Sequence, residues 1–412
     1  MVRFRCAPRA TSKGVDRPLR DIRVCDVTQN LAGPFCSQIL ADLGATVIKV
    51  EPPGGDLGRL WGPPFWGEDS TLFLSANRGK RSIVIDLKQE AGMDVLRRLA
   101  ESCDVFVQAS RPAAARRLGV DAASVRKWRE DIVHLSLSAY GQDGPMSDQP
   151  GYDPLMQAYA GIISVTGQPD GVPTRVGGSV VDFGTGMWAA ISVLAALRER
   201  DRSGCGAALE ASLMDTSLAW VSYHMMGYMA TGRVPAPMGS SLGAIAPYRA
   251  FRTSDGYVMI AAGNDAIFRR LCEALDLDGV GDDPRFASNA ERVAHRAELD
   301  PIVEDATERL STNELLRRTR AHAIPASMIQ SIDQVVDDPQ VQAAGMFPVV
   351  DHPEIAGYRD VSLPVRLDGE RLRAGRMPPA AGEHTVELLE ELEFDRASID
   401  QLLASGVVSS TD

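Results

Sequence analysis

An acidic residue stands where an apolar segment turns into a helix in VVDFGTGMWAAISVLAALRER, residues 180–200. Asp182 follows two valines, and a segment with helical period comes after it. One role for such an acid is to cap the helix, because a carboxylate accepts hydrogen bonds from the free N–H groups of the first turn. The other role is nucleophilic attack, which a carboxylate can perform at neutral pH without a base. This stretch alone leaves both roles open.

Basic residues form the second group with chemical potential, because several gather near predicted strand-to-helix turns in the first half of the chain. They are Lys80, Arg81, Lys88, Arg111, Arg116 and Arg117. Each alone is most simply a solvated surface charge, but together they are a candidate patch for an anionic group. The whole chain has a net charge of −12, which disfavours nucleic acid and anionic membranes as partners.

The cysteines predict neither a metal site nor a disulfide framework. All six lack C-x-x-C spacing; they are Cys6, Cys25, Cys36, Cys103, Cys205 and Cys272. Reduced thiols are typical of the cytosol, so we expect a cytoplasmic protein. The first fifteen residues contain four basic residues and no acid. They are typical of a basic extension or of a mitochondrial presequence, which leaves the mitochondrial matrix as an alternative.

Strand and helix signals alternate in the first half. Apolar runs at 22–27, 46–50, 82–87, 104–110 and 132–138 alternate with helical patterns at 34–45, 91–102 and 123–131. This order predicts an α/β fold with a mostly parallel sheet, whose ligands bind at the carboxyl ends of the strands. The first turn reads TQNLAGP and lacks the G-x-G-x-x-G pattern, which argues against a dinucleotide-binding domain.

The amino-acid composition changes after about residue 235, where a Pro-, Gly- and Ser-rich stretch begins. We predict a large α/β domain and a smaller α+β domain. The expected segments are an N-terminal extension at 1–18, the first part of the large domain at 19–235, the small domain at 240–325, and a return to the large domain with C-terminal helices at 326–412. The apolar run at 213–230 is expected to be a buried helix, because it contains an aspartate and a histidine.

Several stretches, in order, resemble the class III CoA-transferases of the CaiB/BaiF type, which include formyl-CoA, carnitine and dicarboxylate CoA-transferases. They are VCDVTQNLAGPFCSQILADLGATVIKVEPP (24–53), RGKRSIVIDLK (78–88), GYDPLMQAYAG (151–161), DFGTGM (182–187), LEASLMD (209–215) and AAGEHT (380–385). The resemblance covers about residues 19–407. It implies a Rossmann-like large domain built from both ends of the chain, a small domain between them, and an interlocked homodimer.

The resemblance also implies a role for the residues of the opening stretch. The aspartate at the position of Asp182 would be the nucleophile that attacks the thioester of an acyl-CoA. Gly184 and Gly186 would leave room for the thioester and offer N–H groups to a developing oxyanion. CoA thioesters would be substrates, and no permanently bound cofactor or metal is expected.

By the same resemblance, a set of residues falls at positions that contact CoA. They are Ala32, Ile85, Lys88, Ala109, Ser110, Arg111 and Arg117. The sequence departs from the formyl-CoA enzyme at residues 31, 32, 52, 109 and 110. Tyr152 is expected to shape the CoA pocket and Asp153 to hydrogen-bond near it.

Two alternatives remain open from the sequence. The α-methylacyl-CoA racemases of the same superfamily use a histidine in a G-H-D motif, whereas this chain reads Gly151-Tyr152-Asp153. Tyrosine is a poor base at neutral pH, so transfer is favoured over racemisation. A CoA-binding protein without catalysis is the second alternative, and the presence of Asp182 argues against it.

The stretch MGSSLGAIAPYRAF at 238–251 resembles that of enzymes that move CoA between dicarboxylates such as succinate and glutarate. Several of those relatives have histidine where this chain has Leu242. We therefore expect an acyl-CoA and a small organic acid as substrates, with succinyl-CoA as a candidate donor.

Overall fold

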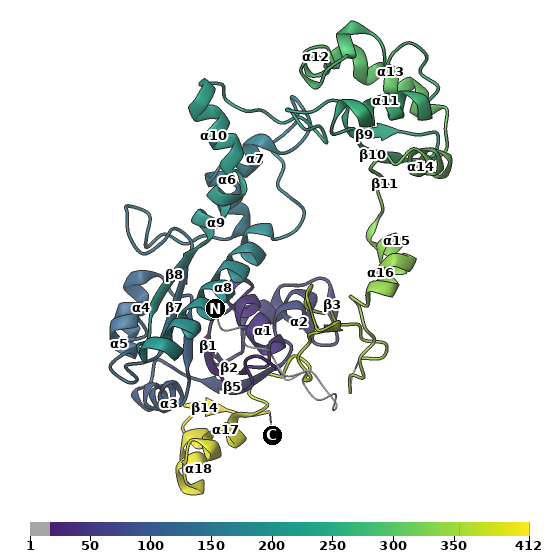
Figure 1. The fold of residues 1–412 in the computed structure, drawn as a ribbon. Helices are drawn as coiled ribbons and strands as arrows, with labels where there is room; N and C mark the ends of the chain where they lie inside the picture. Colours follow the sequence, from purple (N-terminus) through teal and green to yellow (C-terminus); the bar gives the residue numbers. More distant parts are fainter. Residues whose placement is uncertain (1–16, 354, 412) are drawn as a thin grey trace, which may run out of the picture. The chain divides into compact units, whose positions relative to one another are not determined.

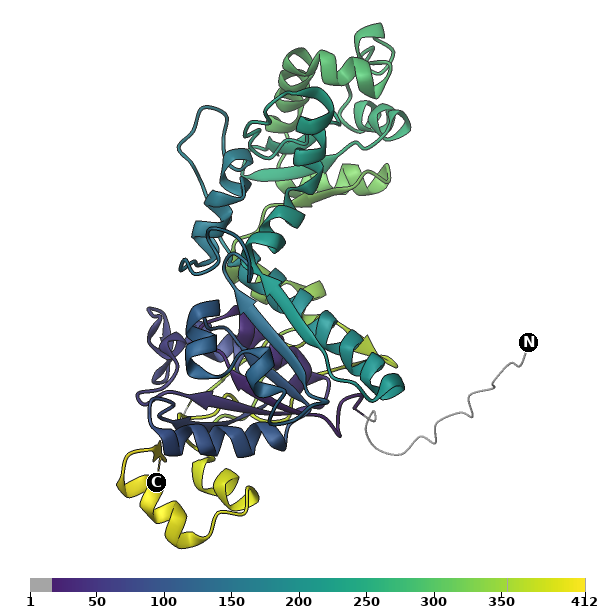
Figure 2. The ribbon, with the colours of Figure 1, turned by 90° about the vertical axis from the view of Figure 1, so that its left-hand side faces the viewer.

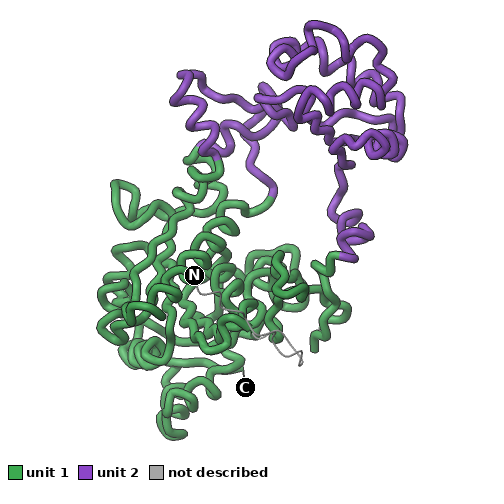
Figure 3. Tube along the Cα trace, viewed as in Figure 1, with its two compact units in different colours: residues 1–160, 178–220, 344–412 green, residues 161–177, 221–343 purple. Residues whose placement is uncertain are grey.

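The structure, a computed structural model, describes residues 17–353 and 355–411 and divides into two compact units (Figure 3). Unit 1 comprises Met1–Ala160, Gly178–Trp220 and Ala344–Asp412, within those limits, and unit 2 comprises Gly161–Gly177 and Val221–Ala343. The predicted small domain, 240–325, lies inside unit 2. All but two residues of the predicted extension, 1–18, lie outside the described residues.

The core of unit 1 is a seven-stranded sheet (Figure 1). Its strands, in spatial order, are β14 (Val408–Ser409), β5 (Lys80–Ile85), β2 (Thr46–Glu51), β1 (Arg23–Val27), β6 (Val105–Gln108), β7 (Val133–Ser138) and β8 (Ala208–Ser212). Every pairing is parallel except that of β14 with β5. The prediction of an α/β fold with a mostly parallel sheet is therefore confirmed.

Helices cover both faces of this sheet, as expected for strands that are buried throughout. Alternate residues of the strands point to opposite faces: Val24 and Val47 belong to one core cluster, Cys25 and Ile48 to the other. The first cluster contains residues of α1 (Ala32–Asp42) and α8 (Val180–Ser203). The second contains residues of α3 (Glu90–Glu101), α17 (Thr385–Glu391) and α18 (Arg396–Ala404). Figure 2 shows α8 and the C-terminal helices on opposite sides of the sheet.

Shorter elements complete unit 1. They are the helices α2 (Thr71–Ala76), α4 (Pro112–Leu118), α5 (Ala122–Val125), α6 (Asp153–Tyr159) and α9 (Leu213–Trp220), the 3-10 turn Leu57–Leu60, and the two-stranded pairs β3 (Phe65–Trp66) with β4 (Asp69–Ser70) and β12 (Arg366–Leu367) with β13 (Glu370–Arg371). The helix predicted at 123–131 shrinks to the four residues of α5.

Unit 2 packs helices against a three-stranded antiparallel sheet of β9 (Tyr248–Arg252), β10 (Tyr257–Ala261) and β11 (Ala326–Met328). Its helices are α7 (Ile162–Val165), α10 (Ser222–Thr231), α11 (Asp265–Ala274), α12 (Asn289–Ala294), α13 (Arg296–Glu308), α14 (Thr312–Ala321), α15 (Ile332–Asp337) and α16 (Pro339–Ala344), the last reaching the unit boundary, with a 3-10 turn at Pro284–Phe286. Phe251, Val258 and Ile260 of the sheet lie in the core of this unit.

The apolar run at 213–230 is not the single buried helix that the sequence predicts. It divides at Val221 into α9 and α10, and no residue of α10 is buried. Among the described residues, the one helix that is long and apolar enough to cross a membrane is α8. Half of its apolar window is buried, because Ala189, Val193 and their neighbours pack on the sheet of unit 1.

Candidate active site

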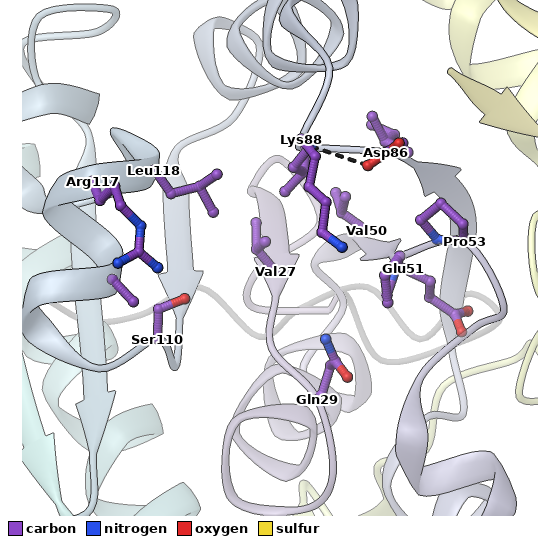
Figure 4. Close-up of a pocket in the computed structure, with 14 residues that line it drawn as sticks. Val27, Gln29, Val50, Glu51, Pro53, Asp86, Lys88, Ser110, Arg117 and Leu118 are labelled. Carbon is purple, nitrogen blue, oxygen red and sulfur yellow. Dashed lines mark hydrogen bonds between the residues drawn. The ribbon is translucent and has the colours of Figure 1, made fainter. Parts of the chain in front are cut away.

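A cavity of 560 Å³ lies at the edge of the sheet where the parallel strands end. Its walls come from the ends of β1, β2 and β5, from the turn after β6, and from α4 (Figure 4). Four residues predicted from the sequence line it; they are Ile85, Lys88, Ser110 and Arg117. The carboxyl-edge rule for parallel sheets therefore places the cavity where it was expected.

Lys88 and Arg117 bring positive charge to this cavity from different elements (Figure 4). Lys88 follows β5, and its backbone N–H donates to the Asp86 carboxylate over 3.0 Å. Arg117 lies in the last turn of α4 and is exposed. Within residues 17–353 and 355–411, neither side-chain cation forms a hydrogen bond or an ion pair. Both are therefore available to an anionic group.

The other predicted CoA contacts do not line this cavity. Ala32 is the first residue of α1, and Ala109 is exposed directly after β6. Arg111 precedes α4, where its guanidinium donates to the Asp148 carbonyl over 3.2 Å. Tyr152 precedes α6, is 47% exposed and contacts the ring of Trp61, with 5.5 Å between ring centroids.

Lys80 and Arg81, which the sequence suggested as part of the basic patch, are structural. Lys80 is fully buried, and its ammonium lies 3.1 Å from the Asp26 carboxylate. The Arg81 guanidinium is paired with Glu387 and Glu391, both on α17 and each at 2.9 Å. Both basic residues stand at the beginning of β5, away from the carboxyl edge of the sheet, so neither belongs to the cavity.

Sequence reasoning missed several residues of the cavity wall. They include Val27, Gln29, Glu51, Pro53, Asp86 and Leu118. Each lies within a few residues of a strand end or in α4, so the predicted strand boundaries were the signal that could have found them.

Glu51 is one of two acids among the residues that line the cavity, the other being Asp86, and its carboxylate is already paired. Its carboxylate accepts hydrogen bonds from Arg59 at 2.7 and 2.9 Å and from the Ser82 hydroxyl at 2.7 Å. Burial alone would raise the pKa of Glu51, but Arg59 and the nearby Lys49 lower it to about 2. The carboxylate is therefore charged and already paired, which limits its repulsion of an anion in the cavity.

A buried ion pair ties together the two loops that enter the cavity. Asp26 of β1 stands in register with Lys49 of β2. The Lys49 ammonium lies 2.6 Å from the Asp56 carboxylate and donates to the Thr28 carbonyl over 2.9 Å. Asp56 in turn accepts the Asn30 N–H over 3.0 Å. The ammonium of Lys49 inside the sheet thereby fixes both the turn after β1 and the loop after β2.

Asp182 lies in the first turn of α8, in the same unit as the cavity. It is half-buried, and within the part of the chain that the structure describes its carboxylate accepts no hydrogen bond. Burial raises the pKa of Asp182 to about 7, and the nearby Asp153 contributes in the same direction. The surroundings of Asp182 therefore favour its protonated form more than the sequence alone suggested.

The cap of α8 is Asp153, not Asp182. One Asp153 oxygen accepts the N–H of Val181 over 2.7 Å and that of Asp182 over 3.2 Å. The other oxygen accepts the amide of Gln157 over 2.5 Å. Asp153 is buried at the start of α6, so it reaches α8 from a different helix. The capping hypothesis for Asp182 is thus wrong, because another acid occupies the donors.

Close packing explains why positions 184 and 186 are glycines. A Cβ on Gly184 would meet Trp220 of α9 at 2.6 Å, and a Cβ on Gly186 would meet the Ala32 carbonyl of α1 at 2.7 Å. Both lie beyond the first turn of α8, where N–H groups donate to carbonyls within the helix. That these two glycines contribute to an oxyanion site stays a prediction. Their backbone N–H groups are already used within the helix and are not free to donate to an oxyanion.

In unit 2, the loop 242–246 is fixed by two neighbouring helices. Arg296 of α13 donates to the carbonyls of Leu242 and Ile245, each over 2.8 Å. Asn289 of α12 donates to the Ala244 carbonyl over 2.9 Å. This is the stretch whose sequence resembles the dicarboxylate enzymes. The side chains that fix it were not predicted, because they lie more than 40 residues downstream.

The described residues contain no group of three or more His, Cys, Asp or Glu side chains that could hold a metal ion. The described part of unit 1 instead holds a cavity lined by two cations without ion-pair partners and, separately, an acid of raised pKa in the first turn of a helix. Such an arrangement can bind a phosphorylated ligand and supply a carboxylate nucleophile.

Comparison with known proteins decides the family. The sequence profile of the family described as CoA-transferase family III matches residues 19–385. The chain belongs to CoA-transferase family III. This confirms the resemblance seen in the sequence and the prediction of a CoA-transferase.

Individual relatives of this CoA-transferase agree with the family match. A succinate–glutarate CoA-transferase of Agrobacterium fabrum is 39% identical over 383 residues, which are 91% of this chain and 96% of the relative. A succinyl-CoA:glutarate CoA-transferase of Homo sapiens is 35% identical over 394 residues, covering 95% and 90%. A CAIB/BAIF family protein from Brucella suis has a solved structure with a TM-score of 0.82 and 34% identity, covering 92% of this CoA-transferase and all of that chain.

Proposed function

We propose that this CoA-transferase moves CoA from succinyl-CoA to a small dicarboxylic acid, with Asp182 as nucleophile. The observation that carries the proposal is the half-buried carboxylate of Asp182, held at the start of α8 with its oxygens unoccupied by donors from the described residues. The substrates are inferred from the relatives, two of which are named for succinate or succinyl-CoA and glutarate.

The reaction exchanges one activated acyl bond for another. A carboxylate oxygen of Asp182 attacks the thioester carbonyl carbon, and the C–S bond breaks to release CoA thiolate and leave a mixed anhydride. The thiolate then attacks the aspartyl carbonyl, which releases the donor acid and forms an aspartyl-CoA thioester. The acceptor carboxylate repeats both steps in reverse order, and Asp182 returns as a free carboxylate.

The 560 Å³ cavity is the proposed site for the nucleotide end of CoA. Lys88 and Arg117 supply the free positive charge there, and Ile85 and Ser110 supply an apolar and a polar wall. Ala32 lies next to Gly186 of α8, the helix that carries Asp182, and remains a proposed contact. Ala109, Arg111 and Tyr152 remain proposed contacts outside the cavity.

Arg117→Ala is expected to raise the KM for every acyl-CoA by about 10-fold or more with little change in kcat, because a charge-assisted hydrogen bond to phosphate contributes about 1.5–3 kcal/mol. Steady-state kinetics with succinyl-CoA and two other acyl-CoA donors measures this effect. Arg116→Ala is the matched control, since Arg116 is exposed on the same turn of α4 and does not line the cavity. An effect on one donor only would place Arg117 beside the acyl group instead.

The activity itself is tested by incubating the protein with succinyl-CoA and glutarate and following glutaryl-CoA by mass spectrometry. Formation of glutaryl-CoA without ATP is the expected result.

The racemase alternative is tested in the same format with a chiral 2-methylacyl-CoA in deuterated water. Exchange at the α-carbon in the absence of transfer would reject the proposed function, and Tyr152 in place of the racemase histidine predicts no exchange.

An interlocked homodimer and a cytoplasmic location are also part of the proposal. Helix α10 supports the dimer, because Tyr223, Met226 and Met229 are each more than 60% exposed in the single chain. A second chain is the occupant that the family resemblance suggests for this apolar face. The location rests on the reduced-thiol pattern of the sequence, with the mitochondrial matrix as the alternative.

A further inference from the structure

The start of α8 carries two carboxylates with unlike surroundings. Asp153 has donors on both oxygens: the N–H groups of Val181 and Asp182 on one, the Gln157 amide on the other. All three partners donate, which is the pattern that an ionised carboxylate satisfies. Asp182 has none of these donors, although its own backbone N–H is one of the two that Asp153 takes.

The free N–H groups in the first turn of a helix ordinarily donate to a side-chain oxygen, most often that of the N-cap residue, which in α8 is Ser179 and makes no such bond. Such bonds to an acid stabilise its charge and make its oxygens less basic. In α8, Asp153 reaches in from α6 and accepts two of these N–H groups, while the carboxylate of Asp182 accepts no hydrogen bond from the described residues and lacks this stabilisation. Its oxygens stay more basic, and a more basic oxygen is the better nucleophile once it is ionised.

Asp153 is the acid that acts electrostatically on Asp182 from the elements packed against α8. These elements are α1, α6, α9, β7 and β8. Their other titratable groups are Cys36 and Asp42 on α1, Tyr159 on α6, Asp215 on α9, His134 on β7 and Glu210 on β8. Asp42 is paired with Arg78, and Asp215 accepts a hydrogen bond from the Ser212 hydroxyl over 2.7 Å. None of them contributes to the raised pKa of Asp182, for which burial and Asp153 are the causes.

We propose that Asp153 is a positioning residue for the nucleophile: it caps α8 in place of Asp182 and, through its charge, holds Asp182 as a basic, unpaired carboxylate. The inference rests on the proposed role of Asp182. It assigns to Asp153 a function in the chemical step rather than the contact with CoA that the sequence suggested.

The test separates the cap from the charge. Asp153→Asn keeps an oxygen that can accept both N–H groups, and Gln157 can turn its amide to offer an oxygen to the new NH₂ group. The variant should therefore fold and cap α8 but lack the charge. Because ionised Asp182 is the active form, the wild-type kcat should rise with pH through about 7. In Asp153→Asn the pH at which kcat rises should be lower than in the wild type by at least about one unit.

At pH 6 the Asp153→Asn variant should then be faster than the wild type, with the KM for succinyl-CoA changed less than about twofold. Asp215→Asn on α9 removes an equal charge next to α8 and should not change the pH at which kcat rises. A wild-type profile that coincides with that of Asp153→Asn would overturn the proposal. Asp153→Ala, which lacks the cap as well, should show a lower Tm than Asp153→Asn, and equal Tm values would also count against it.

A second measurement distinguishes failure of this inference from failure of the proposed function. Wild-type protein is incubated with succinyl-CoA, treated with borohydride, and digested for mass spectrometry. A reduced Asp182 is expected. Its absence would reject Asp182 as nucleophile, whatever Asp153 does. Reduced Asp182 together with an unmoved pH profile in Asp153→Asn would reject the role of Asp153 alone.

Discussion

Asp182→Asn is expected to lower CoA transfer by on the order of 10⁴-fold or more, because the amide cannot form the anhydride on which both half-reactions depend. The KM for acyl-CoA should change little, since Asp182 does not line the cavity proposed to bind the nucleotide end of CoA. Coupled assay of glutaryl-CoA formation measures the loss. Asp201→Asn, at the exposed other end of α8, is the matched control and should retain activity.

The same variant should be more stable than the wild type, and the gain should depend on pH. The folded state raises the pKa of Asp182 from an ordinary 3.8 to about 7, first by burial and then by Asp153. Stability from such a group is present below its unfolded pKa and is lost as pH rises through the folded pKa. Asp182→Asn should therefore match the wild type near pH 4 and exceed its Tm by about 1–3 °C at pH 8. Equal Tm values at pH 8 would mean that ionised Asp182 is not strained in the fold.

The second large effect is expected from the buried pair beneath the cavity. Lys49→Met removes the only ion-pair partner that the described residues give the Asp56 carboxylate, and both side chains are fully buried. Leaving one charge of a buried pair uncompensated costs about 3–5 kcal/mol, which for a chain of 412 residues corresponds to a fall in Tm of about 3–6 °C. Differential scanning calorimetry on the variant measures this fall.

The double variant Lys49→Met/Asp56→Asn is the informative companion. If the cost comes from the stranded carboxylate, neutralising Asp56 should recover a large part of the lost Tm. If the cost comes from the packing of the lysine chain, the double variant should be no better than the single one. In both variants the KM for acyl-CoA should rise, because the Thr28 carbonyl and Asp56 fix the loops that form the cavity.

The sheet and the cavity were predictable because they follow from local patterns. Alternating apolar runs give the parallel strands, and the residues after those strands gather at one edge. The family resemblance, rather than a local pattern, suggested Ile85, Lys88 and Ser110 as CoA contacts, and all three line the cavity at this edge. Arg81 was misplaced because it stands at the start of β5, where its guanidinium faces α17. That helix lies about 300 residues away in sequence, and no local pattern reveals such a partner.

The environment of Asp182 was the least predictable part. The local sequence places an acid in the first turn of a helix, and this was correct. It does not show that Asp153 occupies the donors, because α6 reaches α8 only through the packing of distant segments. It also does not show why Gly184 and Gly186 lack side chains, since their neighbours lie on α9 and α1. The pKa of a site depends on these contacts rather than on the spacing of residues.

The antiparallel strand β14 bears on how the protein is synthesised. Every residue that lines the nucleotide cavity leaves the ribosome within the first third of the chain, yet the outer side of β5 stays open until Val408 can pair with Ile85. Translation at about 5–20 residues per second leaves that edge uncovered for about 16–65 s. A nascent chain in this state exposes the unpaired edge of β5, and an unpaired strand edge can pair with other chains. Val408 and Ser409 thus cover an edge of the sheet that is otherwise unpaired, and deletion of β14 is expected to lower solubility although it removes no residue of the cavity wall.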